Sequence, residues 1–230
     1  MADRISSSIK FVNLHAHTCV GSPFDAISYP PEHLEFAYEN GLEAFAITEH
    51  GNCNSIPYQV LHAQKMAKEG KKIKPIYGVE AYFHPSIAEW RQLKFEREQE
   101  KKFAKEETSG AVMENEEETK SGNKKKDPLK KRGHLVLLAK NQTGLNNIFS
   151  LISKSFQDDH FYMFPRIDFD DLREHSEGVI ALSACLGGVL AKDFWEHRDS
   201  GSEAVVQAIC ETTEKFQDVL GKENFYHELQ

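Results

Sequence analysis

Residues 44–50 read AFAITEH, a short apolar run that ends in an acidic residue and a histidine. Short apolar runs rich in β-branched residues and bounded by turn formers are typical of buried strands. Five other segments have the same character: 10–14, 74–79, 134–139, 179–183 and 225–229. The sequence therefore predicts six strands, and the run from Ala44 to Thr48 is the second.

Helical segments lie between these strands. They are expected at 31–39, 58–69, 141–154 and 202–220. The first starts with Pro31 and stops at Asn40-Gly41, which are good residues for a helix start and a helix end. Strands that alternate with helices predict an α/β fold with a mainly parallel sheet, either open or closed into a barrel.

The segment from about Ile87 to Arg132 interrupts this alternation. It is dominated by Lys and Glu and has few residues able to enter a core. We expect one domain over 1–230 with a charged insertion here, whose first half can form a solvated helix through i,i+4 charge pairs. Its second half, Thr108 to Asp127, is expected to be a mobile loop. The basic run at 124–132 could contact a nucleic-acid backbone, but the neighbouring acidic run at 114–118 favours a solvated insertion.

The composition of the chain limits which binding partners and which cellular compartments are expected. The chain has 230 residues and a net charge of −8, so a polyanion would have to meet a local basic patch or metal ions. Its four cysteines form no CxxC pair. We expect no secretory signal and no membrane span, and therefore a cytoplasmic protein.

Residues able to bind metals recur at the ends of the expected strands. These residues are His15, His17, His50, Glu80, His134 and Cys185. Most follow or end a strand, at the edge where parallel α/β folds build active sites, whereas His134 opens its strand. Imidazole, carboxylate and thiolate are ligands of zinc, with manganese or iron possible where oxygen ligands dominate.

The spacing of the first two histidines suits a metal ion. In a strand, residues i and i+2 point to the same side, so His15 and His17 can present two imidazoles to one ion. The carboxylate of Glu80 can bridge two cations, which would activate a water and neutralise a phosphoryl group. Arg166 could contact a phosphate oxygen, because a guanidinium matches that geometry.

Each residue alone also has a simpler explanation. A single histidine near a strand end is more often a surface residue, and Cys185 alone would be a buried structural thiol. Asp25, in GSPFDAI, is more often a turn or cap residue than a ligand. The joint pattern over four successive strands favours a metal site.

Six blocks of sequence resemble the PHP (polymerase and histidinol phosphatase) domain at the N-terminus of bacterial and phage DNA polymerase III alpha subunits. In chain order they are LHAHT, ITEHGN, KPIYGVEAY, HLVLLAKNQTGLNNI, PRIDFDDL and SEGVIALSACLGG. The resemblance implies a distorted (β/α)7 barrel that holds up to three divalent metal ions, zinc or manganese. It implies metal-dependent 3′–5′ exonuclease proofreading, with a DNA 3′ end and the remaining polymerase domains as partners. The ligands implied are His15, His17, Asp25, His50, Glu80, His134 and Cys185, with Glu80 and His50 also serving the chemistry.

The chain departs from the family pattern at three places. Glu49 precedes His50 where the family commonly has Asp, and the loop before Asp25 is about one residue longer than usual. The family's last ligands, an Asp-x-His pair, would lie beyond YHELQ, so we expect a fragment that lacks its last strand and part of the metal site.

Two other functions remain open at this point. The domain could hold metal only to brace a polymerase core, in view of Glu49 and the expected missing strand. It could also be a free-standing phosphatase of the histidinol phosphate type, which shares the HxH motif, although the longer blocks favour the polymerase branch.

Overall fold

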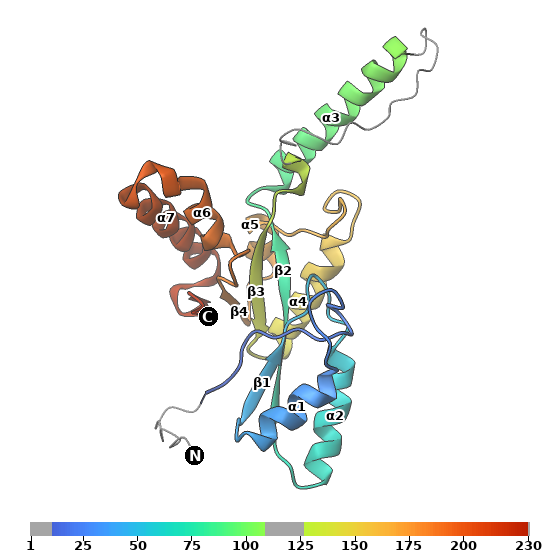
Figure 1. Ribbon diagram of the computed structural model, residues 1–230, viewed down its shortest axis with the longest axis vertical. Coiled ribbons are helices and arrows are strands. Elements are labelled where there is room, and N and C mark those ends of the chain that lie inside the picture. The colour runs from blue at the N-terminus through green and yellow to red at the C-terminus, as the bar shows by residue number, and fades with distance from the viewer. Residues whose placement is uncertain (1–10, 109–126, 230) are drawn as a thin grey trace.

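The computed structural model describes residues 11–108 and 127–229. Their sheet has five strands in the order β1-β2-β3-β4-β5. The strands are β1 (Ala44–Ile47), β2 (Lys74–Phe83), β3 (Gly133–Ala139), β4 (Val179–Leu182) and β5 (Phe225–Tyr226). Figure 1 shows β2 as the long central strand, which pairs with β1 near its start and with β3 over its second half.

The sheet is mixed, so the expectation of a mainly parallel sheet was wrong. β1 pairs with β2 in parallel, and β4 pairs with β5 in parallel, but β3 is antiparallel to both β2 and β4. The reason lies in the charged segment, which leaves the end of β2 and returns to the same end of the sheet. Phe83 pairs with Gly133 and Tyr82 with His134, so the returning strand must run the opposite way.

The first expected strand, 10–14, is not a strand in the part of the chain that the structure describes. Asn13 forms only an isolated parallel bridge to Phe45. The segment stays beside β1 through two backbone hydrogen bonds, Ala46 N to Asn13 O at 2.9 Å and Thr48 N to Ala16 O at 2.7 Å.

Seven α-helices occur in the described residues. They are α1 (Pro30–Glu39), α2 (Ile56–Lys68), α3 (Ile87–Thr108), α4 (Gln142–Ser155), α5 (Phe169–Glu174), α6 (Val189–His197) and α7 (Ser202–Leu220). The four expected helices are confirmed as α1, α2, α4 and α7. The short helices α5 and α6 were not expected from the sequence. Asp168 caps the start of α5, and Gly188 precedes α6.

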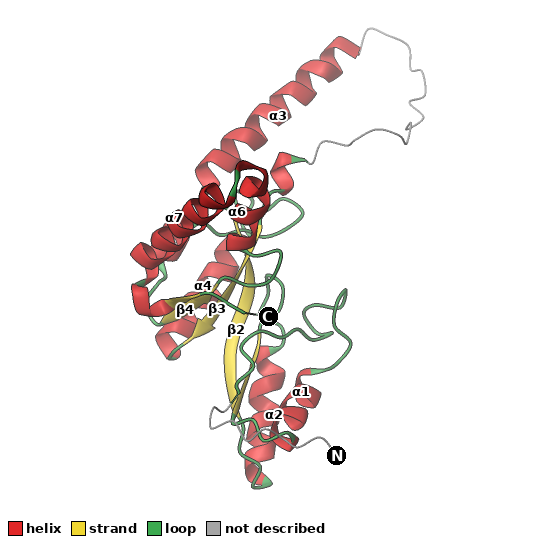
Figure 2. Ribbon diagram, turned by 60° about the vertical axis from the view of Figure 1, so that its left-hand side comes forward, coloured by secondary structure: helices red, strands yellow, loops and turns green. Residues whose placement is uncertain are grey.

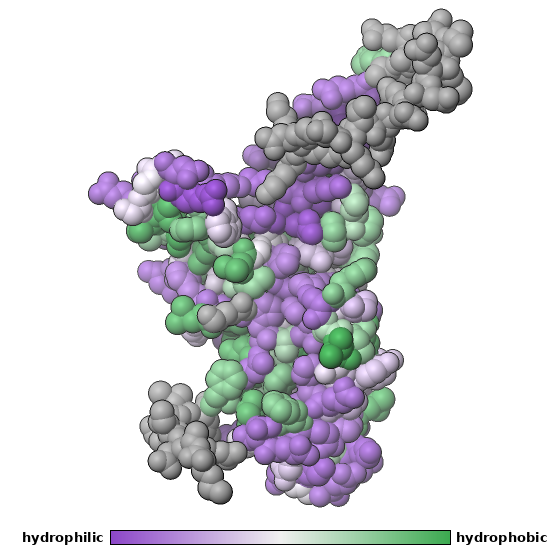
Figure 3. Space-filling model, in the orientation of Figure 1, coloured by the Kyte–Doolittle hydropathy of each residue, from purple (hydrophilic) through white to green (hydrophobic). Residues whose placement is uncertain are grey.

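The first half of the charged segment is helical, as the i,i+4 charge pattern predicted. α3 projects from the body of the protein (Figure 1), and its described surface is mainly hydrophilic (Figure 3). Its base belongs to the core, because Trp90 is buried and its Nε1 donates to Leu129 O at 3.1 Å. Nearly all of the expected mobile loop falls at 109–126, outside the described residues, as do the first three lysines of the basic run, 124–126.

Successive side chains of β2 point alternately to the core face and to a second face of the sheet. Val79, Ala81 and Phe83 join the main core, where α4 and α7 pack against the strands (Figure 2), together with Leu172 of α5. Glu80 and Tyr82 point the other way, since successive side chains of a strand alternate between faces. We call this second face, which also carries His134 opposite Tyr82, the site face. A smaller core joins α1 and α2 to β1.

Among the helices that the structure describes, none is long and apolar enough to cross a membrane.

Candidate metal centre

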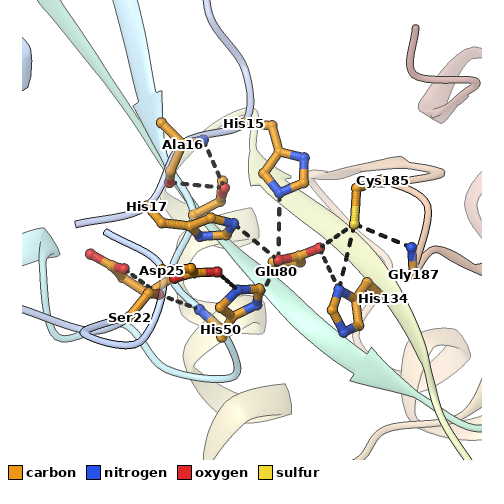
Figure 4. A network of polar contacts seen from close by, with 12 residues as sticks. His15, Ala16, His17, Ser22, Asp25, His50, Glu80, His134, Cys185 and Gly187 are labelled. Atoms are coloured by element: carbon orange, nitrogen blue, oxygen red, sulfur yellow. Dashed lines mark hydrogen bonds and ion pairs between the residues drawn. The ribbon is translucent and has the colours of Figure 1, made fainter. Parts of the chain in front are cut away.

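Glu80 is the centre of a cluster of metal-binding side chains on the site face (Figure 4). Around it lie residues from the segment before α1, from the loop after β1, from β3 and from the loop after β4: His15, His17, His50, His134 and Cys185. Glu80 was expected to end its strand, but β2 continues to Phe83 because those residues still pair with β3. Glu80 therefore lies within the sheet and not at its edge.

The antiparallel direction of β3 explains the unusual sequence position of His134. In a parallel sheet, a residue that opens its strand would lie at the edge opposite to the other candidates. Here the first residues of β3 pair with the last residues of β2, which places His134 beside Tyr82 and close to Glu80.

The two carboxylate oxygens of Glu80 face two groups of donor atoms. Oε2 lies 2.7 Å from His50 Nδ1, 3.3 Å from His17 Nε2 and 3.5 Å from His15 Nε2. Oε1 lies 2.8 Å from His134 Nδ1 and 3.8 Å from Cys185 Sγ. One carboxylate is thus positioned between two groups of ligands, which is the arrangement of a bridging ligand.

Asp25 extends the cluster toward solvent. Its Oδ2 lies 2.7 Å from His50 Nε2, and its side chain is 47% exposed. Three overlapping groups of donor atoms each lie within 4.8 Å: His15, His17, Glu80; His17, Asp25, His50; and His50, Glu80, His134. The structure therefore brings together all seven residues expected to bind metal.

Several buried polar atoms of this cluster have no hydrogen-bond partner in the part of the chain that the structure describes. His17 Nδ1, His50 Nδ1 and Glu80 Oε2 are buried and make no hydrogen bond within the described residues. The short distance between His50 Nδ1 and Glu80 Oε2 is an ion-pair contact without hydrogen-bond geometry. Buried polar atoms are normally satisfied, so this set needs a further partner. Nitrogen, oxygen and sulfur donors at these distances fit divalent cations.

The carboxylates and imidazoles of the cluster shift one another's pKa. Burial alone would raise the pKa of Glu80, but His134, His15, His17 and His50 outweigh burial and lower it. Burial alone would lower the pKa of His15, yet the carboxylates of Glu228 and Glu80 raise it to about 9. The carboxylate of Glu80 thus remains ionised and able to bind cations.

Glu49 supports the cluster without belonging to it. It is fully buried and accepts hydrogen bonds from Thr18 N at 3.1 Å, from the Thr18 hydroxyl, and from Ser22 Oγ at 2.6 Å. Ser22 Oγ in turn accepts from His50 N at 3.1 Å. The longer acid at this position therefore ties the loop between His17 and Asp25 to the end of β1.

Glu228 is a member of this site that the sequence did not single out. Its Oε1 lies 2.7 Å from His15 Nδ1, and its backbone N donates to Ser183 Oγ at 2.9 Å. A carboxylate on the second nitrogen of a metal-binding imidazole fixes the ring orientation. The sequence feature that could have indicated Glu228 is its position in the last expected strand, 225–229.

The expectation that Arg166 contacts a phosphate was wrong. Arg166 is fully buried, and its guanidinium donates to Leu129 O and Phe164 O, both at 2.8 Å. It also stacks on Trp90, with Cζ 4.8 Å from the ring centroid. These contacts fix the base of α3 to the core and leave no exposed surface for a substrate.

A groove of about 970 Å³ opens on the sheet beside the cluster. His15 and Glu228 line one part of it, and the apolar side chains of Ile76, Leu138 and Leu182 line another. The candidate metal site therefore adjoins a large and partly apolar space.

Comparison with known proteins identifies the family. The model of the PHP domain family matches residues 13–230. DNA polymerase III subunit alpha of Borreliella burgdorferi is 33% identical over 226 residues, which cover 96% of this chain and 15% of that protein. The same subunit of Aquifex aeolicus is 33% identical over 220 residues, with the same coverage of 96% and 15%. This chain thus spans about 15% of the length of these relatives.

A solved structure from Bifidobacterium adolescentis, described as a metal-dependent phosphoesterase, has 11% identity and a TM-score of 0.45, covering 88% of this chain and 74% of that one. That likeness is too distant to add to the assignment. The match of the family model over nearly the whole sequence shows that this chain belongs to the PHP domain family.

Proposed function

We propose that this domain is the metal-dependent phosphoesterase of a replicative DNA polymerase and removes nucleotides from DNA 3′ ends as a 3′–5′ proofreading exonuclease. The observation that carries the proposal is Glu80, whose two oxygens each face their own group of metal-binding atoms. A bridging carboxylate between two cation positions suits phosphodiester hydrolysis. The relatives named DNA polymerase III subunit alpha supply the substrate class.

Each residue of the cluster has a separate role in this proposal. The divalent ions, zinc or manganese and up to three in number, would be held by His15, His17, Asp25, His50, Glu80, His134 and Cys185. When bound, such ions supply an activated water and neutralise charge on the phosphoryl oxygens. His50 joins two of the donor groups, because one ring nitrogen faces Glu80 and the other faces Asp25. Glu228 holds His15 in position, and Glu49 holds the loop before Asp25.

We further propose that the sheet is part of the distorted (β/α)7 barrel of the family. Apolar side chains such as Ile76, Leu138 and Leu182 line the groove beside His15 and would become the interior of a closed barrel. In the longer protein, the remaining polymerase domains would be its partners, and replication would place it in the cytoplasm with the DNA.

A structural role for the metal is the second candidate. Five separate segments of the chain contribute donor atoms, from His15 to Cys185, so bound ions would brace the fold whether or not they turn over substrate.

The test uses a 5′-labelled single-stranded DNA and the purified protein with Mn²⁺ or Zn²⁺. We expect shortening from the 3′ end. We expect the double variant His15→Ala, His17→Ala to lose at least about a hundredfold in rate, because loss of even an outer-shell partner of a metal ligand costs about tenfold to hundredfold. His62→Ala is the matched control, because His62 pairs with Glu35 on α1 at 3.1 Å, outside the cluster. Unchanged activity in the double variant would refute the proposal. Stoichiometric metal without any hydrolysis would favour the structural role.

A further inference from the structure

Arg132 is a cationic side chain on the site face that does not belong to the cluster of candidate metal ligands. It lies just before β3, two residues ahead of His134, and its contact with Tyr82 places its side chain on the site face. Its Cζ lies 3.6 Å from the ring centroid of Phe164 and 5.0 Å from that of Tyr82. Tyr82 in turn stacks on His50 at 6.2 Å and meets His134 edge-on at 5.3 Å, measured between centroids. One phenol ring thus separates the guanidinium from two ligands of the metal centre.

The charge of Arg132 has no acidic partner within residues 11–108 and 127–229. Its Nε is buried and makes no hydrogen bond there, and NH1 donates only to the carbonyl of Lys130 at 3.1 Å. Its side chain is half-buried, so water solvates the charge only in part. By contrast the adjacent Lys131 lies 2.8 Å from Glu196.

The two aromatic rings fix the orientation of the guanidinium. Phe164 covers one flat face of the guanidinium, and Tyr82 lies to one side of it, since the two rings meet edge-on with their centroids 5.3 Å apart. Because Nε is buried, the edge formed by the two terminal nitrogens is the part left for a ligand. That edge suits a phosphate, which accepts paired hydrogen bonds from a guanidinium. Tyr82 contacts Arg132 as well as His50 and His134, which places the guanidinium beside the cluster of candidate ligands and not among them.

We propose that Arg132 binds the phosphate next to the scissile one, so that the site is specific for substrates with at least two phosphodiesters. This inference rests on the proposed phosphoesterase function and adds a substrate feature to it. The substrate class becomes a single-stranded oligonucleotide end, and a small phosphate monoester would lack the second contact.

The test measures binding and hydrolysis separately. The first probe is a fluorescein-labelled pentathymidylate whose 3′-terminal linkage is a phosphorothioate, to slow its hydrolysis. The second probe is the same DNA with an uncharged methylphosphonate at the penultimate linkage. Dissociation constants are measured by fluorescence anisotropy in Mn²⁺ for the wild type, Arg132→Gln, Arg132→Lys and Lys131→Gln. Hydrolysis is compared between unmodified pentathymidylate and bis(p-nitrophenyl) phosphate, which has a single phosphate.

We expect Arg132→Gln to weaken binding of the first probe roughly tenfold to hundredfold, the usual range for a hydrogen bond to a charged group. The second probe should bind the wild type and Arg132→Gln alike, since the variant and the methylphosphonate remove the same contact. Arg132→Lys should recover part of the loss, and Lys131→Gln should behave as the wild type. The variant should lose more activity on pentathymidylate than on bis(p-nitrophenyl) phosphate.

Equal weakening on both probes, no weakening, or no binding of the first probe by the wild type would overturn the inference. If the wild type hydrolyses neither substrate but the contrast between the probes persists, the proposed phosphoesterase function fails and the phosphate contact stands.

Discussion

Glu49 shows how one buried side chain holds a loop that carries a candidate ligand. Its carboxylate accepts three hydrogen bonds from Thr18 and Ser22. Glu49→Gln keeps the size but replaces one acceptor oxygen with a donor, which leaves a hydroxyl or amide without its partner. We expect a loss of about 1–3 kcal/mol in the free energy of unfolding, and about tenfold to hundredfold weaker metal binding.

Urea denaturation in EDTA and titration calorimetry with Mn²⁺ measure the two effects. Glu214→Gln, an exposed change on α7, is the control. Metal affinity unchanged in Glu49→Gln would contradict the supporting role of this residue.

A second buried acid predicts a pH dependence of stability away from the metal centre. Asp171 lies 2.8 Å from Lys154 Nζ and 3.2 Å from His160 Nε2. Burial alone would raise the pKa of Asp171, but His160 and Lys154 lower it from 3.8 to about 2. Its stabilisation is therefore present above pH 3.8 and is lost as the pH falls through 2.

His160 titrates in the opposite sense. Burial alone would lower its pKa, but Asp171 and Asp159 outweigh burial and raise it above 6.5. Its contribution is present below pH 6.5 and is lost as the pH rises through its folded value. The difference in free energy of unfolding between the wild type and Asp171→Asn should therefore be greatest between about pH 4 and 6.5. Urea denaturation from pH 2 to 9 checks this, and a difference that does not vary with pH would refute it.

Among the elements, Asp168 joins two helices that are far apart in sequence. Its Oδ1 accepts from Asp170 N and Asp171 N at the start of α5, both at 3.0 Å. Its Oδ2 accepts from Ile87 N at the start of α3, at 2.7 Å. The charged helix is thus fixed to the core at its first residue.

Asp168→Ala removes the cap of α5 and leaves the buried Ile87 N–H without an acceptor. We expect a loss of about 2–4 kcal/mol, the sum of a lost helix cap and an unsatisfied buried donor. Thermal unfolding followed by circular dichroism measures the change, and Asp170→Ala, at an exposed position of the same helix, is the control. Equal stability of the two variants would show that the cap contributes nothing.

For the whole molecule, metal binding should couple to folding, because the donor atoms come from segments between residues 15 and 185. A ligand at a hundred times its Kd stabilises the native state by about 2.7 kcal/mol, which corresponds to roughly 5–10 °C in Tm for a domain of this size. Thermal unfolding with and without Mn²⁺ or Zn²⁺ measures the shift, and EDTA should reverse it. The same shift in the His15→Ala, His17→Ala variant would place the stabilising ion elsewhere.

The sequence predicted the elements with strong local patterns. Helices such as α7 and strands such as β4 followed from hydrophobic periodicity and from their bounding glycines. The short helix α5 was missed because its six residues contain too little of the 3.6-residue period. Residues 10–14 were predicted as a strand because they are apolar, but only Asn13 bridges to β1.

By itself, the sequence determined which residues are candidate metal ligands, since imidazole, carboxylate and thiolate groups at strand ends depend on residue type and local spacing. Tertiary structure decided how those groups meet. The direction of β3 follows from where the charged segment returns to the sheet, and this contact between distant residues places His134 beside Glu80. The positions of the two arginines were decided in the same way, because packing on Trp90 buries Arg166 while contact with Tyr82 holds Arg132 beside the candidate metal site. Local periodicity cannot encode such pairings, since each depends on which surfaces are brought together when the whole chain folds.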